Sequence, residues 1–250
     1  QAGMGALTAV LVMLLVGRWR AGWAPVGAGV AVALAGSLIY FDAELLPASP
    51  AALLVTGWLL MLATPGRPGG RWARLRAPAA GLLLGVGGVL LPTLALPAAL
   101  VLAWMLRREG LKTALIVAVA AAIPILPVTV RNYTYEPDLV PVSWNGGVNF
   151  WIGNNEAFPD TVGIRPGIRW SQLVSQPRCE GGAETRAEES AWFYGQSLSY
   201  IASDPLSWAG DLARKALATV SAREIGRNRN PYAGRDESTV LRLLLLPFGV

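Results

Sequence analysis

The stretch that decides the fold runs for 29 positions without a charge: Pro78-Ala-Ala-Gly-Leu-Leu-Leu-Gly-Val-Gly-Gly-Val-Leu-Leu-Pro-Thr-Leu-Ala-Leu-Pro-Ala-Ala-Leu-Val-Leu-Ala-Trp-Met-Leu106. A straight helix of this length would extend about 44 Å at about 1.5 Å per residue, beyond the roughly 30 Å hydrocarbon core of a bilayer. Pro92 lies in the middle, and proline interrupts helices because it lacks an N–H. We therefore expect two short membrane helices that meet near Leu91 and Pro92.

Similar apolar runs flank this stretch, and about 20 apolar residues suffice to cross a bilayer as a helix. The expected spans are 3–17, 22–40, 49–64, 78–91, 93–106 and 112–130, and residues 239–250 begin a further one. The chain is 53% hydrophobic and 15% charged, whereas a typical soluble domain is about 25% charged. The sequence thus predicts an all-α polytopic membrane protein.

The basic residues indicate which side each loop occupies, because Lys and Arg are enriched in cytoplasmic loops. With two short helices in the central stretch, all nine basic residues before position 131 fall on one side, in the loops 18–20, 66–77 and 107–112. The loop at 41–48 holds none and falls on the other side. An insert at 131–238 is then extracytoplasmic as well.

Composition excludes several chemistries. The chain has no histidine, so metal sites and catalytic triads that need an imidazole are excluded. Cys179 is the single cysteine, which excludes a disulfide within the chain. The insert is slightly acidic, so we expect no nucleic-acid partner.

Within the insert, residues 131–183 are rich in Gly, Pro and Asn and are expected to be mostly loop. Thr185-Arg-Ala-Glu188 is a capping box and predicts the start of a helix. The apolar face of that helix would contain Tyr194, Leu198 and Ile201.

A second helix is predicted from Asp204-Pro205, an N-cap followed by proline at the first helical position. It would end near Ile225-Gly226, with one apolar stripe and one basic face. The stripe comprises Trp208, Leu212, Ala216 and Val220, and the basic face Arg214, Lys215 and Arg223. This pattern suits a helix lying along the membrane surface, and equally one that packs within the insert.

Two groups of residues in the membrane region are candidates for chemistry. Asp42 and Glu44 lie at the outer mouth of a helical hairpin, where carboxylates can act as a base or bind a divalent cation. They can equally be solvated loop acids.

Arg131, followed by Asn132, ends the 112–130 span. The guanidinium of Arg131 can hold a lipid phosphate there or extend to the interface without a ligand.

The stretch from Asn145 to Asn155 combines Gly, Asn and aromatic residues. Asn and aromatic side chains suit sugar binding, since amides bond hydroxyl groups and rings stack on sugar faces. A cluster of turns explains the same composition.

In the central stretch, Gly81-x-x-x-Gly85 is a close-packing pattern of membrane helices.

The order of these pieces resembles bacterial GT-C-type glycosyltransferases that are family 39-like, relatives of protein mannosyltransferases and lipid A aminoarabinose transferases. The first two matching stretches are Leu38-Ile-Tyr-Phe-Asp-Ala-Glu-Leu-Leu46, and Ala80-Gly-Leu-Leu-Leu-Gly85 together with Leu91-Pro92. The third is Pro127-Val-Thr-Val-Arg-Asn-Tyr133 together with Pro141-Val-Ser-Trp-Asn-Gly-Gly-Val-Asn-Phe-Trp-Ile-Gly-Asn-Asn155. The fourth is Asp204-Pro-Leu-Ser-Trp208 together with Arg223-Glu-Ile-Gly-Arg-Asn228. The Arg-Asn-Tyr to Gly-Asn-Asn block is the most specific.

The resemblance implies a GT-C-like helical bundle in the bacterial plasma (inner) membrane. Such an enzyme takes a polyprenyl-phosphate sugar as donor and a lipid, glycan or protein as acceptor, on the outer face. The main catalytic base would lie in an outer loop before Gln1, so the chain is expected to be an inactive piece of a longer enzyme.

Residue by residue, the resemblance maps Asp42 and Glu44 to an assisting acid or a divalent-metal ligand. Arg131 maps to the donor phosphate, and Asn132 beside it to the substrate site. Asn149, Asn154 and Asn155 map to the sugar or to residues that shape the site. The sequence has Ala48 and Leu91 where the family often has an acid and an arginine. Membrane lipids would be a further partner.

Two other functions stay open from the residues alone. A lipid-linked glycan transporter would need polar residues along its spans, and these spans contain few. A non-catalytic membrane scaffold would bind a partner through the insert and would tolerate the loss of Asp42 and Glu44.

Overall fold

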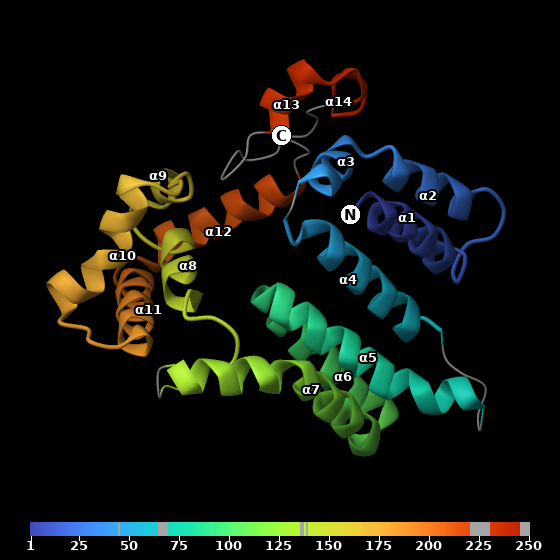
Figure 1. The fold of residues 1–250 in the computed structure, drawn as a ribbon, viewed down its shortest axis with the longest axis horizontal. Helices are drawn as coiled ribbons and strands as arrows, with labels where there is room; N and C mark the ends of the chain where they lie inside the picture. The colour runs from blue at the N-terminus through green and yellow to red at the C-terminus, as the bar shows by residue number, and fades with distance from the viewer. Residues whose placement is uncertain (45, 65–69, 136–137, 139, 221–230, 246–250) are drawn as a thin grey trace. The chain divides into compact units, whose positions relative to one another are not determined.

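The computed structural model describes the whole chain except residues 45, 65–69, 136–137, 139, 221–230 and 246–250. The described residues form helices joined by turns, with no strand among them, which confirms the predicted all-α class. They divide into two compact units, Gln1–Asn132 and Tyr133–Val250 (Figure 1).

The first unit is a succession of apolar helices. They are α1 (Ala2–Val16), α2 (Ala24–Ala33), α3 (Gly36–Ala43), α4 (Ala48–Leu62), α5 (Arg71–Leu90), the 3₁₀ turn η1 (Pro92–Leu94), α6 (Ala95–Glu109) and α7 (Leu111–Tyr135). The long central stretch is broken at Leu91, as expected from Pro92. The run 22–40, expected as one helix, is instead two helices bent by 48°, because Ala35 adopts an extended conformation between them.

The predicted close-packing pattern is confirmed on α5. A Cβ atom built at Gly81 would lie 2.6 Å from the Cβ of Ala120, and one at Gly85 would lie 2.5 Å from the Cγ of Pro124. Glycine at these two positions therefore allows the backbones of α5 and α7 to touch.

The three helices α5, α6 and α7 share one apolar core, formed by Ala77, Met105 and Val117. The ion pair between Arg76 and Glu109 closes the end of the α5–α6 pair beside that core. A charged pair beside an apolar cluster fixes the register of the two helices.

Helix α7 has two contrasting faces. Ala114, Val117, Ala120 and Ala121 are buried. The opposite face is a row of exposed aliphatic side chains: Leu111, Leu115, Val119, Ile123, Leu126 and Val130. Among the described residues, α7 is the one helix that is long and apolar enough by itself to span a membrane, and the bent pair α2–α3 would be a second if counted as one span. Helices α1 and α4 are apolar but shorter.

The second unit contains a larger share of helix than the composition suggested. Its helices are α8 (Gly146–Gly153), α9 (Phe158–Thr161), α10 (Ile168–Gly181), α11 (Arg186–Ser203), α12 (Pro205–Val220), α13 (Pro231–Glu237) and α14 (Thr239–Leu244). The expectation that 131–183 is mostly loop is wrong for α8 and α10. In α8 the glycines serve close packing: a Cβ at Gly147 would lie 2.7 Å from the carbonyl carbon of Ser190 on α11.

The core of the second unit lies where α8, α10 and α11 meet. It comprises Val148, Ile152, Ile164, Leu173 and Phe193. The apolar face predicted on α11 does not supply this core: Leu198 is exposed, while Phe193 and Ser197 are buried. The core therefore packs against a face of α11 that the spacing of apolar residues in the sequence did not predict.

Both predicted helix starts are confirmed. Thr185 Oγ1 accepts a hydrogen bond from the Glu188 N–H, and Glu188 Oε2 accepts one from the Thr185 N–H. Asp204 Oδ1 accepts from the Ser207 N–H at 3.0 Å, and Pro205 begins α12. The predicted end of this helix near Ile225-Gly226 lies outside the described residues, as does Arg223.

Candidate functional site

The first unit contains an open cavity of about 430 Å³ among α1, α2, α3 and α4. Its lining is largely apolar, with Thr8, Asp42 and Ser49 as its polar members. Thr8 donates its hydroxyl hydrogen to the Met4 carbonyl, and Ser49 donates to the Phe41 carbonyl. Both hydroxyl hydrogens are therefore used inside the protein.

Asp42 differs from these two residues. It lies in the last turn of α3 and is half-buried. Within the part of the chain that the structure describes, its carboxylate has no hydrogen-bond or ion-pair partner. Its position depends on Gly5 of α1, since a Cβ there would lie 2.6 Å from the Asp42 Cγ. The cavity thus contains one carboxylate that is free to meet a polar group of a ligand.

The second predicted acid, Glu44, is the residue at which α3 ends. It is half-buried and engaged in an interaction of its own. Over the described ranges, no three His, Cys, Asp or Glu side chains come together as a metal site would require. A cation held by Asp42 and Glu44 would therefore take its remaining ligands from backbone oxygens, water or substrate.

Arg131 and Asn132 lie on α7 near the end of the first unit. Arg131 is exposed, whereas Asn132 is only 1% exposed. A side chain so enclosed has almost no surface to offer a substrate, so of this pair Arg131 is the residue that can reach a ligand.

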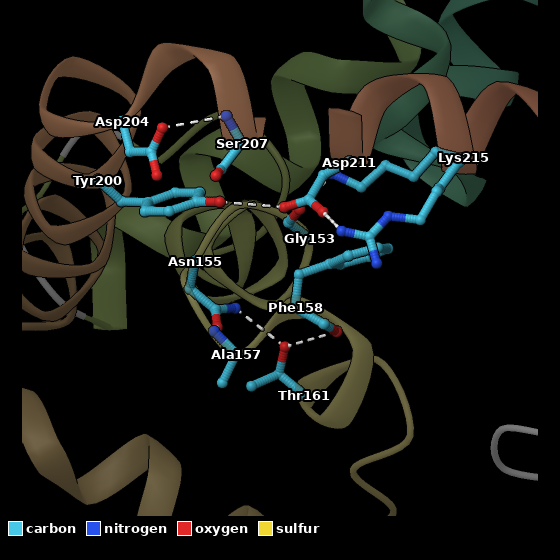
Figure 2. A network of polar contacts seen from close by, with 11 residues as sticks. Gly153, Asn155, Ala157, Phe158, Thr161, Tyr200, Asp204, Ser207, Asp211 and Lys215 are labelled. Carbon is cyan, nitrogen blue, oxygen red and sulfur yellow. Dashed lines mark hydrogen bonds and ion pairs between the residues drawn. The ribbon is translucent and has the colours of Figure 1, made fainter. Parts of the chain in front are cut away.

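Two of the three predicted sugar-binding asparagines are used by the fold of the second unit, and Figure 2 shows one of them, Asn155, beside Thr161. Asn154 Oδ1 accepts from the Trp208 indole N–H at 2.9 Å, and its amide donates to the Phe150 carbonyl. Asn155 is 5% exposed. Its amide donates to Thr161 Oγ1 at 2.9 Å and its Oδ1 accepts from the Ala157 N–H at 2.8 Å. The alternative to sugar binding, in which the asparagines stabilise turns of the backbone, describes these two residues well.

Asn149 is different, because its side chain is exposed on α8. Of the three asparagines it is the one whose amide has open surface for a ligand.

A buried polar network joins α12 to the end of α8, and the sequence analysis did not identify it (Figure 2). Asp211 is 4% exposed, accepts from the Tyr200 hydroxyl at 3.1 Å and pairs with Arg214. Lys215 donates to the Gly153 carbonyl, and its Nζ lies 4.3 Å from the centre of the Phe158 ring. The signal that could have revealed this network is the spacing of Asp211 and Lys215, which puts an acid and a base on one face of the helix.

The network shifts two pKa values. Burial lowers the pKa of Lys215, and the charge of Asp211 opposes that effect. Burial also raises the pKa of Tyr200, and its hydrogen bond to Asp211 adds to the shift. The ammonium group of Lys215 is already engaged by the Gly153 carbonyl and the Phe158 ring. We therefore interpret the network as structural: it holds α12 against α8.

No protein-family model, curated protein or solved structure matches this chain. Its function therefore has to be argued from the chemistry of its own residues, above all from the Asp42 cavity.

Proposed function

We propose that the chain is part of a bacterial membrane glycosyltransferase, a GT-C-like helical bundle with an extracytoplasmic insert at 131–238. It would move a sugar from a polyprenyl-phosphate donor to a lipid, glycan or protein acceptor at the outer face of the inner membrane. The observation that carries the proposal is the unpartnered carboxylate of Asp42 in a largely apolar cavity of about 430 Å³.

The exposed face of α7 supports a membrane setting. Only 17% of its most apolar window is buried, whereas a core helix of a soluble protein is mostly buried. Its outward aliphatic row would face lipid, and its inward alanines pack on Gly81 and Gly85. Membrane helices associate through such small residues because lipid offers no hydrophobic gain for large ones.

In the proposed reaction, an acceptor hydroxyl oxygen forms a bond to the anomeric carbon of the donor sugar. The bond between that carbon and the phosphate oxygen breaks, and polyprenyl phosphate leaves as an anion. Asp42 accepts a hydrogen bond from the acceptor hydroxyl and so assists the main catalytic base, which takes the proton. A divalent cation, where one is required, would be held by Asp42 and Glu44 and would balance the charge of the departing phosphate.

Arg131 is the proposed contact for the phosphate. Arg131 is an exposed residue near the end of α7 that already makes an interaction within the protein, and a guanidinium can bind phosphate oxygens through paired hydrogen bonds that strengthen as negative charge develops. Replacing Arg131 with Ala should raise the donor KM or lower turnover. If both stay at their wild-type values, the phosphate role is wrong.

The test of the cavity is transfer from a panel of radiolabelled polyprenyl-phosphate sugars by membranes that contain the intact protein. Asp42→Asn should lower transfer about 100-fold or more. Gly5→Ala should also lower it, because the added methyl group overlaps the Asp42 carboxylate, while Gly3→Ala, which meets open space, should not. If Asp42→Asn combined with Glu44→Gln leaves transfer intact, the catalytic site is wrong and the scaffold function becomes the better one.

A further inference from the structure

Helix α12 turns its polar side toward the protein, whereas an ordinary amphipathic helix turns its apolar side inward. The residues that face the rest of the second unit are Trp208, Asp211 and Lys215, spaced three and four positions apart. They are held there by the bond from Trp208 to Asn154, by the Tyr200–Asp211 bond and by the Lys215–Gly153 bond. The inner side of the helix is therefore its polar side.

The opposite side of α12 is apolar and exposed. Leu206 is 85% exposed, Leu217 54% and Val220 73%. Gly210 and Ala213, which lie between them on the same face, are exposed as well. The positions 206, 210, 213, 217 and 220 follow the spacing of one helical face, so Leu206, Ala213, Leu217 and Val220 form one aliphatic strip that is interrupted at Gly210.

We propose that this strip is a membrane-surface anchor: α12 lies parallel to the bilayer with Leu206, Leu217 and Val220 inserted at the boundary between headgroups and acyl chains. Amphipathic helices of this kind bury their apolar face about 5–10 Å into that boundary. The anchor is independent of the proposed transferase activity and would serve equally in a scaffold.

The composition of the strip favours lipid over a protein partner. Protein interfaces concentrate their energy in Trp, Tyr and Arg residues near the centre of the patch. The strip has aliphatic and small side chains instead. Arg214, on the flank of the strip, pairs with Asp211 through one nitrogen and keeps a largely exposed side chain, so the remaining N–H groups of its guanidinium can donate to lipid phosphates.

The strip can be located with a single thiol-reactive fluorophore on the intact protein reconstituted in vesicles of zwitterionic and anionic phospholipid. Cys179→Ser removes the one native cysteine, and Leu206→Cys or Leu217→Cys then puts the probe on the strip. Ala218→Cys is the matched control, because the next residue points about 100° away around the helix. Ser171→Cys on α10 is a second exposed control.

Quenching by a nitroxide-labelled lipid should be several-fold stronger at positions 206 and 217 than at 218 and 171, and quenching by aqueous iodide should show the reverse order. If iodide reaches all four positions equally, the strip is free in water and the anchor is wrong. If neither quencher reaches 206 and 217, protein covers the strip, and the anchor is equally wrong. Circular dichroism of each variant confirms that the helices are retained.

Discussion

Gly85→Ala should destabilise the protein although alanine is the better helix former. A Cβ at Gly85 would lie 2.5 Å from the Cγ of Pro124 and 2.9 Å from the carbonyl carbon of Ala121, both on α7. Ordinary contact begins at 3.4 Å. The two backbones would therefore have to separate, and the separation would loosen the core around Val117.

The magnitude follows from two opposing effects. Gly→Ala inside a helix gains about 1 kcal/mol from propensity, while forcing a methyl group into a packed contact costs about 1–3 kcal/mol. Gly88→Ala on the same helix feels only the first effect, because its Cβ would meet nothing nearer than the Cδ1 of Ile125 at 4.0 Å. The two variants should thus differ by up to about 3 kcal/mol, with Gly85→Ala the less stable.

The assay is thermal unfolding of the intact protein in detergent, followed by circular dichroism. For a chain of this size, 1 kcal/mol shifts Tm by about 2–4 °C, so the gap between the two variants should be readily measured. If Gly85→Ala unfolds at or above the temperature of Gly88→Ala, α5 and α7 do not pack through these glycines, and the packing described for the first unit is wrong.

Three further outcomes follow from single contacts. Arg76→Met should cost about 1–2 kcal/mol in unfolding free energy because it leaves Glu109, whose side chain is 25% exposed, without its partner, whereas Met at the exposed Arg74 should cost almost nothing by the same thermal measurement. Asn155→Ala should cost about 2–3 kcal/mol by stranding its buried partners, whereas Asn149→Ala should leave Tm within its error and, if Asn149 binds sugar, raise only the substrate KM. The bonds from Ser207 hold the pKa of Asp204 below its usual 3.8, so this carboxylate stabilises the start of α12 above that pH and ceases to do so as the pH falls through its lowered value. Hydrogen-exchange protection factors at the first turn of α12, which correct for the intrinsic pH dependence of exchange, should therefore fall in acid, and Asp204→Asn should abolish that fall.

Local signals in the sequence predicted the features that depend on a few neighbouring residues. Pro92 predicted the break at Leu91, and Thr185 with Glu188 predicted the start of α11. Each works because the cause lies within one turn of its effect. The bend between α2 and α3 falls at Ala35, directly before Gly36-Ser37, and it was missed because a Gly-Ser pair is a weaker helix-breaking signal than proline.

The site was predictable only in part, for a related reason. Asp42 stood out as an acid in an apolar loop, and the structure puts it in a cavity. Asn154 and Asn155 stood out equally, but their partners Trp208 and Thr161 decide what they do. Trp208 lies 54 positions away in the chain, and no spacing rule identifies a partner at that distance.

Helices α11 and α12 show why apolar periodicity alone was a poor guide to the buried face here. In water, the apolar side of a helix is the buried side, because that is where burial gains free energy. If α12 lies on a bilayer as proposed, this distinction is lost, since lipid receives an aliphatic strip as readily as a protein core does. The face that packs against the protein is then determined by the polar side chains that need a hydrogen-bond partner there, such as Asp211 and Lys215 on α12. On α11 the fully buried residue is Ser197, and exposed Leu198 lies beside it. In a chain of this composition, polar pairs and small residues at helical spacing are therefore the better predictors of the packed face.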